Sequence, residues 1–97
     1  MEWAVHDRNT PLAQAPWETL STRVKLDPAE TTLQPMAGGY RVRFNYKGRV
    51  SDRLGRVTFM GRRPSTQRRC VFVSTLLGAL RRGTNQTSPD RGGRYCY

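Results

Sequence analysis

Residues 40–47, which read YRVRFNYK, carry the pattern that most constrains how this chain folds. Apolar and polar side chains alternate along them. Because successive side chains of a strand point to opposite faces, the pattern predicts a half-buried strand with one cationic face. The alternation continues to Val50, and residues 51–55 then supply the Asp and Gly typical of a turn. Residues 56–60 again place apolar side chains at alternate positions. We therefore expect a β-hairpin over residues 40–61.

Two weaker patterns precede this hairpin. Residues 19–26 alternate in the same way and predict a second strand. The Asp-Pro pair at 27–28 puts a capping residue before a proline at the first helical position, which predicts one helical turn over residues 28–33. Residues 1–18 are expected to form an N-terminal arm or a short helix, because Pro16 ends any longer helix.

The run from residue 65 to residue 82 predicts one helix. Apolar side chains recur there at steps of three and four residues, at Cys70, Val73, Leu77 and Leu80. Ser65 or Thr66 can cap its start, and Gly83 stands where a C-terminal cap residue belongs. Residues 71–73 are also typical of a strand, but the length of the uninterrupted run favours a helix.

The expected fold is therefore α+β, with a small antiparallel sheet of three or four strands packed against one C-terminal helix (about 65–82). The 97 residues suffice for one domain with a modest core, which we place at residues 19–83. Residues 84–97 hold Gly, Ser, Thr, Asn, Pro and Arg without periodicity, so a flexible basic tail is expected there.

Charge is distributed unevenly along the chain, whose formal net charge is +10. Residues 39–97 hold 14 of the 17 cations and only two of the seven acids. A one-sided charge of this kind favours a polyanionic partner, although a solubilising surface is the simpler alternative. Fifteen of the cations are Arg, whose planar donors grip phosphate oxygens and stack on bases, but GC-rich coding also raises Arg over Lys.

Ten cations form the predicted nucleic-acid-binding surface, on the outer face of the central strand, around its turn and around the start of the expected helix. They are Arg41, Arg43, Lys47, Arg49, Arg53, Arg56, Arg62, Arg63, Arg68 and Arg69. Cations at the start of a helix are unfavourable to its dipole, so a bound anion explains the last four better than a structural role does. Residues 91–95, RGGRY, are similar to Arg-Gly segments that bind RNA.

Strands followed by a helix with a basic start, GRRPSTQRRC at residues 61–70, resemble the architecture of the double-stranded-RNA-binding domain. In that family a three-stranded antiparallel sheet precedes a helix whose Lys-rich start spans the phosphates of an A-form groove. The likeness covers about residues 40–80, with Arg in place of Lys and without the family's alanine pair. It is an analogy of architecture, and it implies duplex RNA as the ligand.

Little in the sequence supports an enzyme, a metal site or a cofactor. His6 is the sole histidine and stands beside Asp7 without a nucleophile motif, and one His with two Cys does not supply a four-ligand zinc pattern. We expect Cys70 to pack as an apolar residue of the helix and, with Cys96, to form no disulfide framework, which fits a reducing compartment. Without a signal segment or an apolar run of about 20 residues, the sequence predicts an intracellular protein, cytoplasmic or nuclear, neither secreted nor membrane-spanning.

Two hypotheses for the function follow. The first is a small basic nucleic-acid-binding protein that favours RNA over DNA, with double-stranded RNA as one candidate ligand. It would contact the phosphate backbone without strong sequence specificity, as a viral or phage regulator would. The alternative is a protein-binding inhibitor or adaptor that docks its basic face on an acidic partner protein. In either case the strands can pair edge to edge in a homodimer.

Overall fold

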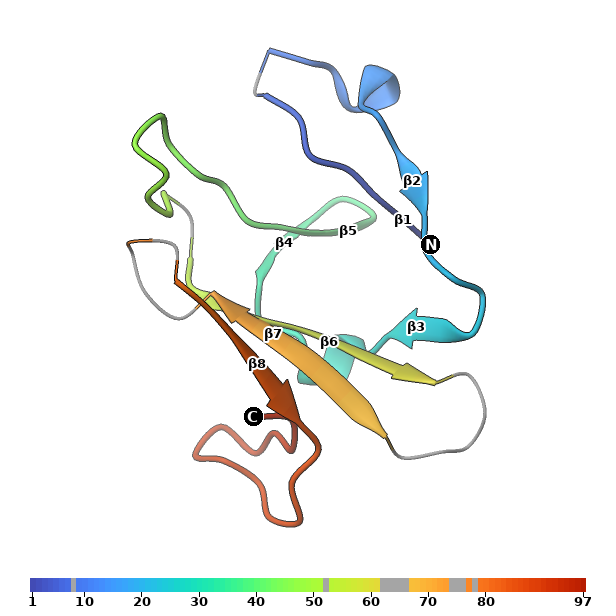
Figure 1. The fold of residues 1–97 in the computed structure, drawn as a ribbon, viewed down its shortest axis with the longest axis vertical. Coiled ribbons are helices and arrows are strands. Elements are labelled where there is room, and N and C mark those ends of the chain that lie inside the picture. The colour runs from blue at the N-terminus through green and yellow to red at the C-terminus, as the bar shows by residue number, and fades with distance from the viewer. Residues whose placement is uncertain (8, 52, 62–66, 74–76, 78) are drawn as a thin grey trace.

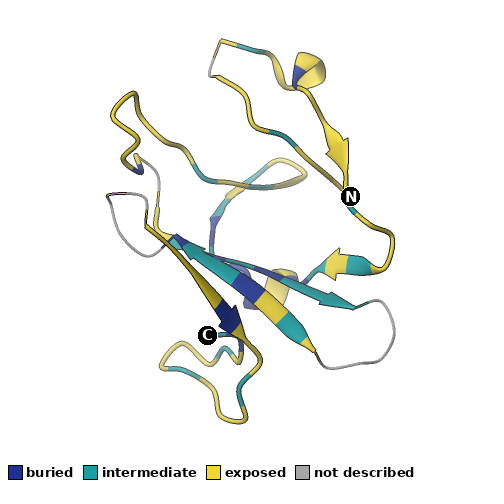
Figure 2. Ribbon diagram, viewed as in Figure 1, coloured by how far each residue is buried: buried dark blue, intermediate teal, exposed yellow. Residues whose placement is uncertain are grey.

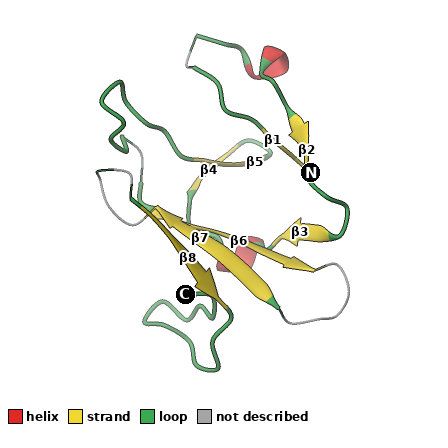
Figure 3. Ribbon diagram, in the orientation of Figure 1, coloured by secondary structure: helices red, strands yellow, loops and turns green. Residues whose placement is uncertain are grey.

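The computed structural model describes residues 1–7, 9–51, 53–61, 67–73, 77 and 79–97. Within these residues the protein is all-β, with eight strands in three antiparallel sheets, as Figures 1 and 3 show. The strands are β1 (Glu2–Trp3), β2 (Glu18–Thr19), β3 (Val24–Leu26), β4 (Gln34–Met36), β5 (Gly39–Arg41), β6 (Gly55–Gly61), β7 (Arg68–Val73) and β8 (Leu80–Thr84). Two single 3₁₀ turns, η1 (Leu12–Gln14) and η2 (Pro28–Glu30), are the helical elements of the described residues. The predicted α+β fold is therefore wrong.

The largest sheet has four strands in the order β3-β6-β7-β8, and two short hairpins, β1-β2 and β4-β5, form the other sheets. Residues paired directly across antiparallel strands share a face. Thr58, Cys70 and Gly83 are in register on one face of the large sheet, whereas Val57 and Val71 lie in register on the other. Figure 1 shows the β4-β5 hairpin and the N-terminal arm above this sheet and the C-terminal residues below it.

Two strands replace the expected helix at 65–82, because β7 pairs with both β6 and β8. Cys70 and Val73, which helical spacing would put on one stripe, point to opposite faces of the sheet, since they are an odd number of positions apart. Gly83 lies inside β8, opposite Cys70, rather than capping a helix. The β-branched and aromatic residues 71–73 fit a half-buried sheet, and pairing on both edges of β7 outweighed the helical period. The expected caps Ser65 and Thr66 lie outside the described residues.

The expected hairpin over 40–61 is also wrong in its pairing, although β6 is a strand as predicted. β5 pairs with β4, and β6 pairs with β3 and β7. The chain turns earlier, at Asn45, whose side-chain Oδ1 accepts hydrogen bonds from the backbone N–H groups of Lys47 (3.0 Å) and Arg49 (3.1 Å). Gly48 has a positive φ of 76°, which favours glycine, and Phe44 bridges to Val50 across the turn.

Sequence signals that involve only neighbouring residues predicted the structure better than the long periodic patterns did. Asp27 caps η2 as predicted, because its Oδ1 accepts a hydrogen bond from the backbone N–H of Ala29 (3.2 Å) with Pro28 at the first helical position. The strand expected at 19–26 is divided, since β2 pairs with β1 and only β3 joins the large sheet. No helix in the described ranges is long and apolar enough to span a lipid bilayer.

The two faces of the large sheet bury different kinds of residue, and Figure 2 shows where along its strands the buried residues lie. On one face Leu33, Val50 and Val73 form a small buried apolar cluster, with Tyr40, Val42 and Val57 partly buried against it. On the other face the buried residues are polar or disulfide-bonded, and Thr58 and Cys96 are completely enclosed. The apolar core is thus small, and the second face needs specific polar contacts to be stable.

The C-terminal segment, residues 85–97, supplies those contacts. A disulfide joins Cys70 of β7 to Cys96, and the backbones of Thr84 and Tyr97 exchange two hydrogen bonds (3.3 and 3.1 Å). Composition alone predicted a flexible tail here and did not indicate these contacts. The disulfide also corrects the expectation that Cys70 packs as a free thiol. The predicted intracellular location stays a prediction, but disulfides are typical of oxidising compartments, so its cysteine argument no longer supports it.

Candidate nucleic-acid interface

The ten predicted cations fall into three groups in the structure. Exposed residues from the last position of β5 to the turn that follows it are Arg41, Arg43, Lys47 and Arg49. Residues that lie outside this stretch are Arg53, Arg56, Arg68 and Arg69, whose side chains donate hydrogen bonds within the protein. Arg62 and Arg63 lie outside the described residues. Four of the exposed members thus lie on one segment, residues 41–49, called the basic loop below.

Arg56 is an interior residue, with 9% of its side chain exposed. Its Nη1 donates to the carbonyl oxygen of Cys96 (2.5 Å), and its Nη2 donates to the carboxylate of Asp90 (2.6 Å). The guanidinium also lies 4.9 Å from the centre of the Phe72 ring. These contacts fasten the C-terminal segment to β6, so the interface considered below does not include Arg56.

Three other cations donate hydrogen bonds within the protein and remain exposed to different degrees. Arg68 pairs with Asp27 (Nε to Oδ2, 3.0 Å) and donates to the Oδ1 of Asn85 (3.0 Å), with 25% of its side chain exposed. Arg53 donates to the carbonyl oxygen of Leu33 (3.2 Å) and Arg69 to the Oε1 of Gln67 (3.2 Å), and both residues are exposed. Arg68 therefore links β7 to the residue before η2 and to the segment after β8, and all three cations keep part of their charge at the surface.

The basic loop is held in shape by its own backbone. The N–H of Asn45 donates to the carbonyl oxygen of Arg49 (2.8 Å), and the N–H of Gly48 donates to that of Asn45 (2.9 Å). Tyr46 at its tip is 93% exposed, and the Nζ of Lys47 lies 5.6 Å from the centre of that ring. The sequence has no acidic residue between Glu30 and Asp52, so no carboxylate neighbours these cations along the chain.

Three carboxylates are used within the fold rather than near the basic loop. Asp27 pairs with Arg68, and the buried Glu30 accepts hydrogen bonds at its Oε1 from the backbone N–H groups of Tyr95 (2.6 Å) and Cys96 (3.1 Å). The backbone N–H of Arg94 and the side chain of Arg56 donate to Asp90 and lower its pKa to about 2. These three acids therefore stabilise the sheet and the C-terminal segment.

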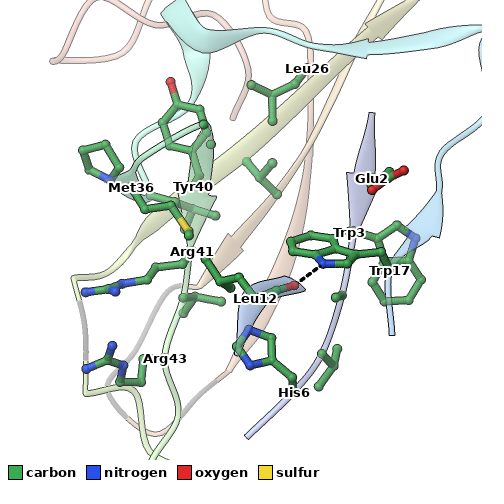
Figure 4. Close-up of a pocket in the computed structure, with 18 of the residues that line it drawn as sticks. Glu2, Trp3, His6, Leu12, Trp17, Leu26, Met36, Tyr40, Arg41 and Arg43 are labelled. Atoms are coloured by element: carbon green, nitrogen blue, oxygen red, sulfur yellow. Dashed lines mark hydrogen bonds between the residues drawn. The ribbon is translucent and has the colours of Figure 1, made fainter. Parts of the chain in front are cut away.

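An open cleft of about 2030 Å³ adjoins the basic loop, between the N-terminal arm, the β4-β5 hairpin and the apolar face of the large sheet (Figure 4). Its lining includes Trp3, Leu12 and Trp17 from the arm, Met36, Tyr40 and Phe44 from the other side, and the cations Arg41 and Arg43. Trp17 is fixed by a hydrogen bond from its Nε1 to the carbonyl oxygen of Leu12 (2.6 Å). Trp3 and Trp17 stay 45% and 42% exposed.

Sequence reasoning missed this cleft, although it contains both tryptophans of the chain. The available signal was two large aromatic residues within an arm that has little patterning of its own. A second missed feature is Arg81, whose guanidinium lies 4.2 Å from the centre of the Phe72 ring, on the opposite edge of β7 from Arg56. Arg81 thus takes part in a row of stacked side chains across the sheet.

Within the residues that the structure covers, no three His, Cys, Asp or Glu side chains gather where they could hold a metal ion. The chain matches no model of a known protein family, no curated protein sequence and no solved structure at a significant level. The resemblance to the double-stranded-RNA-binding domain also loses its basis, because two strands replace the helix that carried it.

Proposed function

We propose that this protein binds nucleic acid, RNA in preference to DNA, through contacts between the basic loop and the phosphate backbone. The observation that carries the proposal is the exposure of Arg41, Arg43, Lys47 and Arg49 on one loop of nine residues without an acidic neighbour in the sequence. Each cation that neutralises a phosphate releases condensed counterions, which makes the affinity depend steeply on salt. Phosphate contacts position the ligand without reading its sequence, so sequence specificity is expected to be weak.

The preference for RNA is supported by what lies beside the cations. Tyr40, Phe44 and Tyr46 alternate with the basic side chains along the same stretch of chain, and the last two are exposed. Aromatic rings and guanidinium planes stack on unpaired bases, and unpaired bases are commoner in RNA loops and ends than in duplex DNA. The helix that pointed to duplex RNA is replaced by β7 and β8.

The test is a filter-binding titration of single-stranded RNA, duplex RNA and duplex DNA at several salt concentrations. Four phosphate contacts would give a slope of about −3 for log affinity against log salt, and therefore about 50-fold weaker binding to a single strand at 200 mM than at 50 mM salt. In the variant R43A/K47A/R49A the slope should become shallower by about 2. The loss should be similar for different sequences, because backbone contacts are removed.

A matched control is the variant R23A/K25A/R91A, which also removes two Arg and one Lys from exposed positions. It changes the net charge by the same amount but leaves the basic loop intact, so a smaller loss is expected. Equal losses in the two variants would mean that net charge alone drives binding. No binding of the wild-type protein to any of the three ligands at about 50 mM salt would overturn the proposal and favour an acidic protein as the partner.

A further inference from the structure

We infer that the open cleft receives the unpaired bases of a single-stranded nucleic acid while Arg41 and Arg43 at its side contact the phosphates. The inference rests on the proposed function and adds to it the strand number of the ligand and the location of the bases. It assigns a binding role to Trp3 and Trp17, which were not among the residues predicted from the sequence.

Apolar and aromatic side chains line the cleft on two opposite sides. The two indole rings belong to the N-terminal arm, and Met36, Tyr40 and Phe44 belong to the β4-β5 hairpin and the basic loop. Both indoles, at 45% and 42% exposure, and Phe44, at 48%, keep large apolar surfaces in contact with water. Covering such surfaces is favourable, and flat rings are covered best by other flat rings.

The distribution of charge around the cleft favours a ligand with an anionic backbone. Arg41 and Arg43 line it on the side of the basic loop, whereas Glu2 and Asp7 line it from the N-terminal arm. The carboxylate of Asp7 accepts hydrogen bonds from the hydroxyl of Thr10 (2.9 Å) and the backbone N–H of Asn9 (3.0 Å), which lower its pKa. Phosphates are therefore drawn to the loop side, and the bases extend from there between the aromatic rings.

A duplex does not fit this arrangement, because its bases are stacked on each other and present only their edges. Each base of a single strand offers a free π face, and stacking on aromatic side chains tolerates any sequence. Apolar surface next to guanidinium groups, with an open entrance, is the combination found in proteins that bind single strands. The cleft therefore selects for unpaired bases, whereas the basic loop alone would accept any polyphosphate.

Trp3 and Trp17 are the only tryptophans of the chain, so intrinsic fluorescence reports on the cleft directly. The probe is a single-stranded oligouridylate of about 12 nucleotides, within the site sizes of known single-strand binders. Inorganic polyphosphate of similar charge is the second ligand, because it carries phosphates without bases. The oligouridylate should quench the tryptophan fluorescence as it binds, and polyphosphate should bind more weakly without quenching.

The variants W3A and W17A should each weaken oligouridylate binding about 10-fold and leave polyphosphate binding unchanged. W3F should retain most of the affinity, since phenylalanine still stacks. The control is Y95A, which removes an exposed aromatic ring that does not line the cleft, and it should bind like the wild type. Circular dichroism of each variant shows whether it is folded, and the W3A variant is decisive because Trp3 lies at the exposed start of the arm.

Two outcomes separate this inference from the proposed function. If oligouridylate, duplex RNA and polyphosphate bind equally well without quenching, and the basic-loop variant still loses affinity, the cleft is not the base site but the protein binds phosphate backbones. If none of these ligands binds, the proposed function fails as well.

Discussion

Arginines that look alike in the sequence have opposite roles in the structure. Arg43 is exposed on the basic loop, whereas Arg56 is buried and donates to Cys96 and Asp90, which are 40 and 34 positions away. The difference follows from the face of β6 on which Arg56 lies, because the C-terminal segment covers that face. Local pattern cannot show such a partner, so the sequence grouped Arg56 with the exposed cations although the structure buries it.

The carboxylate of Asp90 should make the unfolding free energy depend on pH. Hydrogen bonds from Arg94 and Arg56 lower its pKa from 3.8 to about 2, so the folded state favours the charged carboxylate. A carboxyl group with a lowered pKa stabilises the fold above its unfolded-state pKa and loses that effect as the pH falls. The wild type should therefore exceed D90N in unfolding free energy above pH 3.8, and the difference should shrink as the pH falls to about 2. Urea denaturation at a series of pH values measures it, and a pH-independent difference would contradict the prediction.

Among the secondary-structure elements, the sequence correctly predicted those that depend only on residues close to one another in the chain. The Asp27 cap and the η2 turn are confirmed, because capping needs only a side chain and an N–H two positions away. The helix at 65–82 and the hairpin at 40–61 are wrong, because strand pairing depends on edges supplied by distant residues. A helical period and a strand period both describe residues 70–73, and β6 and β8 decide between them.

The start of β6 packs closely against the residues that follow η2. A Cβ atom on Gly55 would lie 2.6 Å from the backbone oxygen of Thr32, whereas a Cβ on Gly61 of the same strand would meet nothing within 4 Å. Since backbone atoms cannot move aside cheaply, G55A should lower the unfolding free energy by about 1–3 kcal/mol. G61A is the control and should change it by no more than about 0.5 kcal/mol. Equal effects in thermal denaturation would show that β6 does not approach Thr32 this closely.

At the scale of the whole molecule, the C-terminal segment compensates for a small apolar core. Leu33, Val50 and Val73 form the buried apolar cluster on one face of the large sheet, and the opposite face is closed by the disulfide and by the hydrogen bonds of Glu30. Because a disulfide can form only between cysteines that the fold brings together, two cysteines 26 residues apart did not predict it. The basic loop lies on the other side of the sheet from this segment (Figure 1).

The disulfide between Cys70 and Cys96 should affect the stability of the fold but not RNA binding. Replacing both cysteines in C70S/C96S opens a covalent link across 26 residues, which should lower the unfolding free energy by about 3–4 kcal/mol through the entropy of the unfolded chain. The C-terminal segment should then detach more often, so trypsin should cleave after Arg91 and Arg94 faster than in the oxidised wild type. A reducing agent should have the same effect on the wild type and none on the variant. RNA binding by the folded variant should stay unchanged, because the basic loop does not touch the disulfide. Equal stability and equal cleavage of the two proteins would show that the segment is held without the disulfide.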